Sequence, residues 1–314
     1  MRRIFYFCPD FSLPSGGTKL LYRHVFQLNR LGFNAAIVHQ ATGFVLTWHG
    51  YQVPVVWLDG KPGFTQEDIL VFPEGMTDFI KATRQAGVTR VIIPLNWSYI
   101  YRCLPPGEDW TDYGVTQVIT PSPVIKEFVE WSMGLPVTLI DDYIDTVRFS
   151  FQPEKKINKI AYMSRKSAVG DILRRILERK PGLVTSYQWA RLQDLNEDEY
   201  ARQLIESRIY LTANPQEGAN ISVLEAMSAG CLVIGFAGVG GNAFMVGQGK
   251  QQNCFLVENE DLLALGKTLE AVVTEMAKDN HCFDQIIRNG MATAGQFRDL
   301  DREAASLKRY FESL

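Results

Sequence analysis

Hydrophobic residues occur along the chain in short runs that alternate with stretches of helical periodicity. Helical spacing is clearest at 18–31, where Leu20, His24 and Leu28 recur four residues apart. Two further helices are expected at 77–86 and 123–131. Apolar runs typical of buried strands lie between and around these helices, at 3–8, 35–39, 53–58, 69–72, 90–94 and 117–120. This alternation predicts a parallel sheet that helices cover on both faces.

The alternation pauses at the polar segment 141–156, which we interpret as a linker, and then resumes. Strands are expected at 159–163, 183–186, 209–213, 231–236 and 254–257, and helices at 169–179, 197–206, 220–229, 261–278, 284–297 and 301–311. The pattern predicts an α/β protein with two doubly wound, Rossmann-like domains that face each other across a cleft. We place the domains at 1–148 and 149–299. Ligands of such sheets bind beyond the carboxyl ends of the strands.

Composition narrows the class of protein. The chain has 314 residues, 46% of them hydrophobic, and a net charge of −3, so no overall basic field favours nucleic acid. Five cysteines without a C-x-x-C pair favour reduced thiols in a cytoplasmic protein. No apolar stretch approaches the roughly 20 residues of a membrane span, although peripheral membrane contact stays open. The four histidines lack ligand spacing, and we predict neither metal nor cofactor.

The segment "NPQEGANISVLEAMSAGCLVIG" (214–235) carries the clearest candidate chemistry. A strand leads into a small-residue loop, and Asn220 is expected to cap the next helix by accepting from a backbone N–H. Gly230 suits the left-handed residue that ends this helix. Unpaired N–H groups at 219–221, together with the helix dipole, favour an anion. Glu217 precedes the helix and Glu225 lies inside it. From the residues alone, a sugar-nucleotide site and an ordinary capped helix with two unrelated acids remain equally open.

Two glycine-rich segments are weaker candidates. "PSGGTKLL" places Gly16 and Gly17 before a helix, which favours either a substrate loop or a plain tight turn. It is not a Walker A motif, because Thr18 stands at the lysine position. "GVGGNA" (238–243) matches G-x-G-x-x-A, the pattern of a dinucleotide-dependent oxidoreductase. That alternative requires the loop to open a helix, and no sustained helical period follows it.

Several of these segments resemble a known family in the order in which they occur. Glu217-Gly218-Ala219 followed by "VLEAMSAGCLVIG" resembles the E-x₇-E segment of retaining GT-B glycosyltransferases, especially glycosyltransferase family 4. "DDYIDTVRF" resembles the hinge of that family, and "IAYMSRKSAVGDILRRIL" resembles the strand, arginine and helix that open its nucleotide domain. The last helix, at about 300–314, resembles the C-terminal helix that packs back on the first domain.

The resemblance implies a GT-B fold and a metal-independent transfer of a sugar, with retention of configuration, from a nucleotide-diphosphate sugar to the hydroxyl of a saccharide or lipid-linked acceptor. Glu225 would bind the donor ribose, Glu217 would face the donor sugar, and Arg165 with Lys166 would neutralise the diphosphate. Glu217 and Arg165 are the implied catalytic residues. Besides Lys166 and Glu225, the implied donor-binding residues are Gly218, Ala219, Asn220, Ile221, Gly17, Gly240 and Gly241, and the implied acceptor-side residues are Gly16, Asn96 and Trp97. Trp189 is a candidate for stacking on the base.

The chain departs from the family pattern at two positions. The family places a lysine about five residues after the arginine, where this chain has Gly170. It also has a histidine after a mid-domain strand, where "RVIIPLNWSYIYR" contains none. Two alternatives therefore stay open. One is a catalytically idle relative that binds a nucleotide sugar or a glycan. The other is a GT-B nucleotide-sugar epimerase, which would need a second acid–histidine pair.

Overall fold

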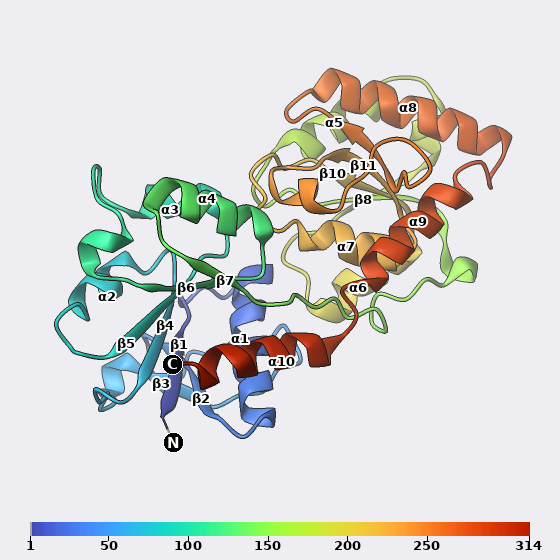
Figure 1. Ribbon diagram of the computed structural model, residues 1–314. Coiled ribbons are helices and arrows are strands. Elements are labelled where there is room, and N and C mark those ends of the chain that lie inside the picture. Colours follow the sequence, from blue (N-terminus) through green and yellow to red (C-terminus); the bar gives the residue numbers. More distant parts are fainter. Residues whose placement is uncertain (1) are drawn as a thin grey trace. The chain divides into compact units, whose positions relative to one another are not determined.

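The first unit of the protein contains a sheet of seven parallel strands. The computed structural model describes residues 2–314, and this unit comprises the residues up to Asp142 together with Leu300–Leu314 (Figure 1). Its strands run in the order β3-β2-β1-β4-β5-β6-β7. They are β1 (Arg3–Phe7), β2 (Asn34–His39), β3 (Val55–Trp57), β4 (Ile69–Pro73), β5 (Thr89–Ile93), β6 (Gln117–Thr120) and β7 (Val137–Leu139). Its helices are α1 (Gly16–Arg30), α2 (Thr77–Ala82), α3 (Trp97–Cys103), α4 (Pro123–Met133) and α10 (Leu300–Glu312), with short 3₁₀ turns at Leu58–Gly60 and Trp110–Tyr113.

Side chains of this sheet alternate between two hydrophobic layers, as the period of a strand requires. On β1, Ile4 and Tyr6 enter the layer that α1 and α10 cover, whereas Phe5 and Phe7 enter the layer that α2, α3 and α4 cover. The last helix, α10, lies alongside α1 (Figure 1). The predicted parallel sheet with helices on both faces is therefore confirmed.

The second unit, Tyr143–Asp299, contains five parallel strands in the order β12-β11-β10-β8-β9. They are β8 (Ile157–Tyr162), β9 (Gln188–Arg191), β10 (Ser207–Thr212), β11 (Leu232–Phe236) and β12 (Cys254–Val257). Its helices are α5 (Val169–Leu177), α6 (Glu197–Glu206), α7 (Ile221–Ser228), α8 (Leu262–Lys278) and α9 (Asp284–Gly295), with 3₁₀ turns at Pro153–Lys155, Leu183–Ser186 and Gly240–Ala243. The strand order reverses between β8 and β10, which makes their carboxyl ends the switch point where doubly wound sheets bind ligands.

The local structure departs from the sequence analysis at several points. The strand predicted at 183–186 is a 3₁₀ turn, closed by the Tyr187 N–H, which donates to the Val184 carbonyl. The strand itself, β9, begins at Gln188. Trp189, the candidate for stacking on the base, is therefore a strand residue, and its ring packs against Tyr162. The sequence reading also missed α3 and the short edge strand β7, whose segments lack a clear period.

Candidate functional site

The loops that follow β8 and β10 leave the sheet side by side, because these two strands are paired with Tyr162 opposite Leu211. The first loop carries Arg165 and Lys166. The second carries Glu217 and the small residues that lead into α7. Two segments about fifty residues apart in sequence are thus brought together at the switch point of the second sheet, where the sequence analysis placed the donor.

An ion pair joins the two loops. Lys166 Nζ lies 2.8 Å from Glu217 Oε2, and the two side chains are 18% and 20% exposed. The other carboxylate oxygen of Glu217 accepts a hydrogen bond from the side-chain amide of Asn214. Because both ends of the ion pair reach solvent, its contribution to stability is about 1 kcal/mol or less. Its structural effect is to hold an acid and a cation at one point.

Arg165 differs from Lys166 because its side chain is exposed and makes no hydrogen bond or ion pair with another residue of 2–314.

At the position where the family has its lysine, this chain has Gly170, and a tyrosine ring lies against it. A Cβ atom on Gly170 would lie 2.5 Å from the ring of Tyr162, whose hydroxyl donates to Asp171. The tyrosine ring thus fills the space that a longer side chain at position 170 would need.

Asn220 begins α7 but does not cap it as predicted. Its backbone is left-handed, with φ of +50°, and its side chain makes no capping bond. The side-chain amide instead donates to the Ala237 carbonyl at 2.9 Å, just beyond β11. Asparagine tolerates this backbone conformation better than most residues. The predicted cap is absent because the Asn220 side chain bonds to the end of the neighbouring strand and so cannot fold back on its own helix.

The glycines of 238–241 pack directly against the acidic loop. The Gly240 N–H donates to the Glu217 carbonyl at 2.9 Å, and a Cβ atom on Gly240 would lie 2.4 Å from the Gly218 carbonyl oxygen. Gly241 is buried beside Met245. This segment opens a four-residue 3₁₀ turn and not an α-helix. The condition set for the dinucleotide alternative is therefore not met.

Glu225 is a buried acid on α7, only 8% exposed. Tyr200, on α6, donates its hydroxyl to Glu225 Oε2 at 3.0 Å. Burial, reinforced by the neighbouring carboxylate, raises the pKa of Tyr200 well above its usual value, so the phenol stays protonated. The sequence analysis placed Glu225 inside this helix, which the structure confirms. The sequence offered no sign that it bonds to a tyrosine 25 residues earlier.

The candidate residues of the first unit gather at the carboxyl edge of its sheet. Gly16 and Gly17 open α1, and a Cβ atom on Gly17 would lie 2.9 Å from the Leu95 side chain. Asn96 is buried and caps α3, where its side chain accepts from the Ser98 N–H at 2.9 Å. Asn96 is thus committed to holding a helix start. Trp97 is partly buried, with its ring against Phe128.

Glu74, which the sequence analysis did not single out, shapes the same edge. It directly follows β4, is only 4% exposed, and accepts from the Leu95 N–H at 2.8 Å and the Asn96 N–H at 2.9 Å. The carboxylate therefore fixes the loop after β5. No spacing signal could have identified this role, because the two segments are 21 residues apart and meet only through the pairing of β4 with β5.

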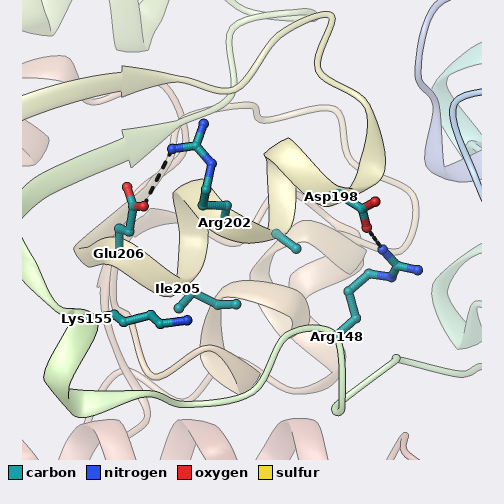
Figure 2. Close-up of a pocket in the computed structure, with 7 residues that line it drawn as sticks. Arg148, Lys155, Asp198, Arg202, Ile205 and Glu206 are labelled. Atoms are coloured by element: carbon teal, nitrogen blue, oxygen red, sulfur yellow. Dashed lines mark hydrogen bonds and ion pairs between the residues drawn. The ribbon is translucent and has the colours of Figure 1, made fainter.

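A pocket of about 310 Å³ lies elsewhere in the second unit, between α6 and the segment that enters the unit. Figure 2 shows two ion pairs at its rim, Arg148 with Asp198 and Arg202 with Glu206. Ala201 and Ile205 form its apolar part. None of the predicted site residues lines this pocket. The wall carries three cations, Arg148, Lys155 and Arg202, against two acids, Asp198 and Glu206.

Within residues 2–314, no group of three or more histidine, cysteine, aspartate or glutamate side chains is arranged to hold a metal ion. No helix in this range combines the length and the apolar character that a membrane crossing requires.

Known proteins resemble this chain in sequence and in fold. An alpha-1,6-glucosyltransferase of Actinobacillus pleuropneumoniae serotype 7 is 27% identical over 240 residues, which cover 74% of this chain and 72% of that protein. Sucrose-phosphate synthase of Thermosynechococcus elongatus superposes with a TM-score of 0.76 at 11% identity, covering 100% of this chain and 99% of that one. HepE of Anabaena, in complex with UDP, superposes with a TM-score of 0.71 at 15% identity over the full length of both chains. No protein-family profile matches.

The chain is a glycosyltransferase homologue with the GT-B fold. The predicted α/β class, the two Rossmann-like sheets and the suspected resemblance to GT-B glycosyltransferases are therefore confirmed. The role of each site residue stays a prediction, because the fold likeness is at 11–15% identity and places elements without assigning chemistry to single side chains.

Proposed function

We propose that this protein transfers a sugar from a nucleotide-diphosphate donor to an acceptor hydroxyl, with retention of the anomeric configuration and without a metal ion. The observation that carries the proposal is the junction of the β8 and β10 loops at the switch point, where Lys166 pairs with Glu217 shortly before the start of α7 and the exposed Arg165 is the neighbour of Lys166 in the chain. Cations and a helix N-terminus suit a diphosphate, and the nearby acids suit sugar and ribose hydroxyls.

In this proposal the second unit binds the donor. Arg165 and Lys166 stabilise the negative charge that develops on the diphosphate as the bond between the anomeric carbon and the phosphate oxygen breaks. The N–H groups of 218–221 add to this stabilisation, and Gly240 and Gly241 border the donor sugar. Glu217 faces the donor sugar and Glu225 binds the ribose.

The first unit binds the acceptor in this proposal. Gly16 and Gly17 at the start of α1 allow close approach to the substrates. Asn96 and Trp97 shape the acceptor side, and Asn96 acts through the loop that it caps. The acceptor is a saccharide or a lipid-linked saccharide, and the five free cysteines suit a reducing, cytoplasmic compartment.

UDP is the first donor nucleotide to test. Solved structures of Anabaena HepE contain UDP and UDP-glucose, and the curated relative is a glucosyltransferase. The proposed donor is therefore UDP-glucose, transferred to a sugar hydroxyl.

A binding screen tests the donor site. Thermal unfolding of the full chain is measured with UDP, GDP, ADP, TDP and CDP in EDTA, for wild type and Glu225→Ala. One nucleotide should raise the midpoint, because ligand at 100 times its dissociation constant adds about 2.7 kcal/mol of stability. The shift should vanish in Glu225→Ala and persist in Glu258→Ala, an exposed acid of the same unit. No shift with any nucleotide contradicts the proposal.

Turnover separates the proposed function from its two alternatives. Wild type with UDP-glucose and an acceptor should give a glycoside whose anomeric configuration, read by NMR, matches that of the donor. The idle-relative alternative, favoured by the tyrosine ring that fills the space beside Gly170, predicts binding with neither transfer nor hydrolysis. An epimerase would interconvert donor epimers without any acceptor.

A further inference from the structure

We propose that Tyr200 is a positioning residue that orients the carboxylate of Glu225 for the ribose of the donor. This inference rests on the proposed function, which assigns the ribose to Glu225. Tyr200 lies on α6, outside every motif that the sequence analysis identified.

The contact itself is direct. The Tyr200 hydroxyl donates to Glu225 Oε2 at 3.0 Å, and the carboxylate is only 8% exposed. A hydrogen bond to one carboxylate oxygen restricts rotation about the last bond of the glutamate side chain and so fixes the plane in which ribose hydroxyls must approach. Bonds to charged acceptors are the stronger kind in proteins.

The tyrosine is itself held in place. Its backbone N–H donates to the Asn196 carbonyl at 2.9 Å in the first turn of α6. Its ring meets the ring of Phe149 edge-on, with centroids 5.8 Å apart and an interplanar angle of 82°. Phe149 is fully buried. Replacing Tyr200 with phenylalanine therefore removes the hydroxyl while retaining the ring packing.

A tyrosine in this position also keeps one role over a wide pH range. Because burial holds its pKa far above neutrality, the phenol keeps its proton and remains able to donate to Glu225. Ribose hydroxyls donate to the same carboxylate, so a fixed phenol and the ligand can share it without rearrangement.

The experiment compares a ribonucleoside diphosphate with its 2′,3′-dideoxy form, by calorimetry on the full chain, with UDP and 2′,3′-dideoxy-UDP tried first. Wild type should bind UDP much more tightly. In Tyr200→Phe, the affinity for UDP should fall about tenfold, while the affinity for the dideoxy form should not change. The preference for ribose thus shrinks by the same factor. A purely structural role would weaken both ligands equally.

Two controls sharpen the result. Tyr187→Phe alters another buried tyrosine of the same unit, one packed on the opposite face of the sheet, and should leave both affinities unchanged. In Glu225→Gln, adding Tyr200→Phe should cause no further loss of ribose preference, because the group to be oriented is already altered.

The outcomes distinguish this inference from the function on which it rests. If Tyr200→Phe keeps the wild-type ribose preference while Glu225→Gln loses it, the positioning role is overturned and the donor site stands. If wild type binds none of the five nucleoside diphosphates, the proposed function and the positioning role are both overturned.

Discussion

Replacing Glu303 with glutamine should make the stability of the protein rise with pH over an interval in which wild type varies little. Glu303 on α10 is fully buried, and its Oε1 accepts from Arg23 Nε at 2.8 Å. The same guanidinium donates to Asp142 Oδ1 at 2.7 Å. His24 is also fully buried, with its Nε2 3.7 Å from Glu303 Oε1. Burial raises the pKa of Glu303 to about 7 and lowers that of His24 well below 6.5.

The two groups act in opposite directions between about pH 4.5 and 6.5. Folded Glu303 keeps a proton that the unfolded chain releases, so it lowers the free energy of unfolding as pH rises toward 7. Folded His24 lacks a proton that the unfolded chain binds below 6.5, so it lowers the free energy of unfolding as pH falls. Each slope is at most about 1.4 kcal/mol per pH unit, and in wild type the two largely cancel.

The assay is denaturant unfolding of the full chain at intervals from pH 4.5 to 7. Glu303→Gln leaves the histidine slope alone, so stability should rise with pH up to about 6.5. His24→Gln removes the contribution of His24 and leaves that of Glu303, so the slope of stability against pH should be more negative than in wild type over the same interval. Glu312→Gln, an exposed acid on the same helix, should behave like wild type. A Glu303→Gln slope equal to that of wild type would mean that the ion pair with Arg23 keeps Glu303 charged, and the reasoning would fail.

Three further substitutions test the second unit. Gly230→Ala should lower the free energy of unfolding by about 1–2 kcal/mol because of its left-handed backbone, with φ of +75°. It should lower it further because the new Cβ lies 2.2 Å from the ring of Phe151. In calorimetric unfolding, adding Phe151→Ala should relieve the clash with the ring but not the backbone strain. Gly170→Ala should cost about 1–3 kcal/mol in urea unfolding, whereas the same substitution should add little to the loss already caused by Tyr162→Ala, which removes the ring that the new Cβ would meet. Lys166→Met should change stability by less than about 1 kcal/mol yet weaken UDP binding about tenfold in calorimetry; equal UDP affinity would remove Lys166 from the donor site.

Much of the fold could be predicted because its strands are continuous apolar runs buried on both faces. The segments 69–72 and 254–257 lie within a residue of the strands found. Prediction failed where local pattern and tertiary context disagree. The segment 183–186 includes an apolar valine, yet it closes a turn, and Asn220 has the composition of a cap but a left-handed backbone.

The candidate site divides in the same way. Glu217 and Glu225 could be found because both belong to one segment whose spacing places them around a helix start. Tyr200 and Glu74 could not, because each reaches its partner through the pairing of strands or helices distant in sequence. Spacing within a segment therefore predicts candidate residues around a helix start, whereas the side chains that bond to them can be found only from the fold.

The ion pair at the switch point is weak enough for a ligand to exchange with it. Lys166 is paired with Glu217, while Arg165 is exposed to solvent. A pair that is about one-fifth exposed contributes about 1 kcal/mol or less, so a phosphate oxygen can take Lys166 away at small cost. Asn214 also donates to the Glu217 carboxylate. In the proposed function this second bond would keep the acid beside the donor sugar while the lysine turns to the diphosphate, and product release would restore the original pair.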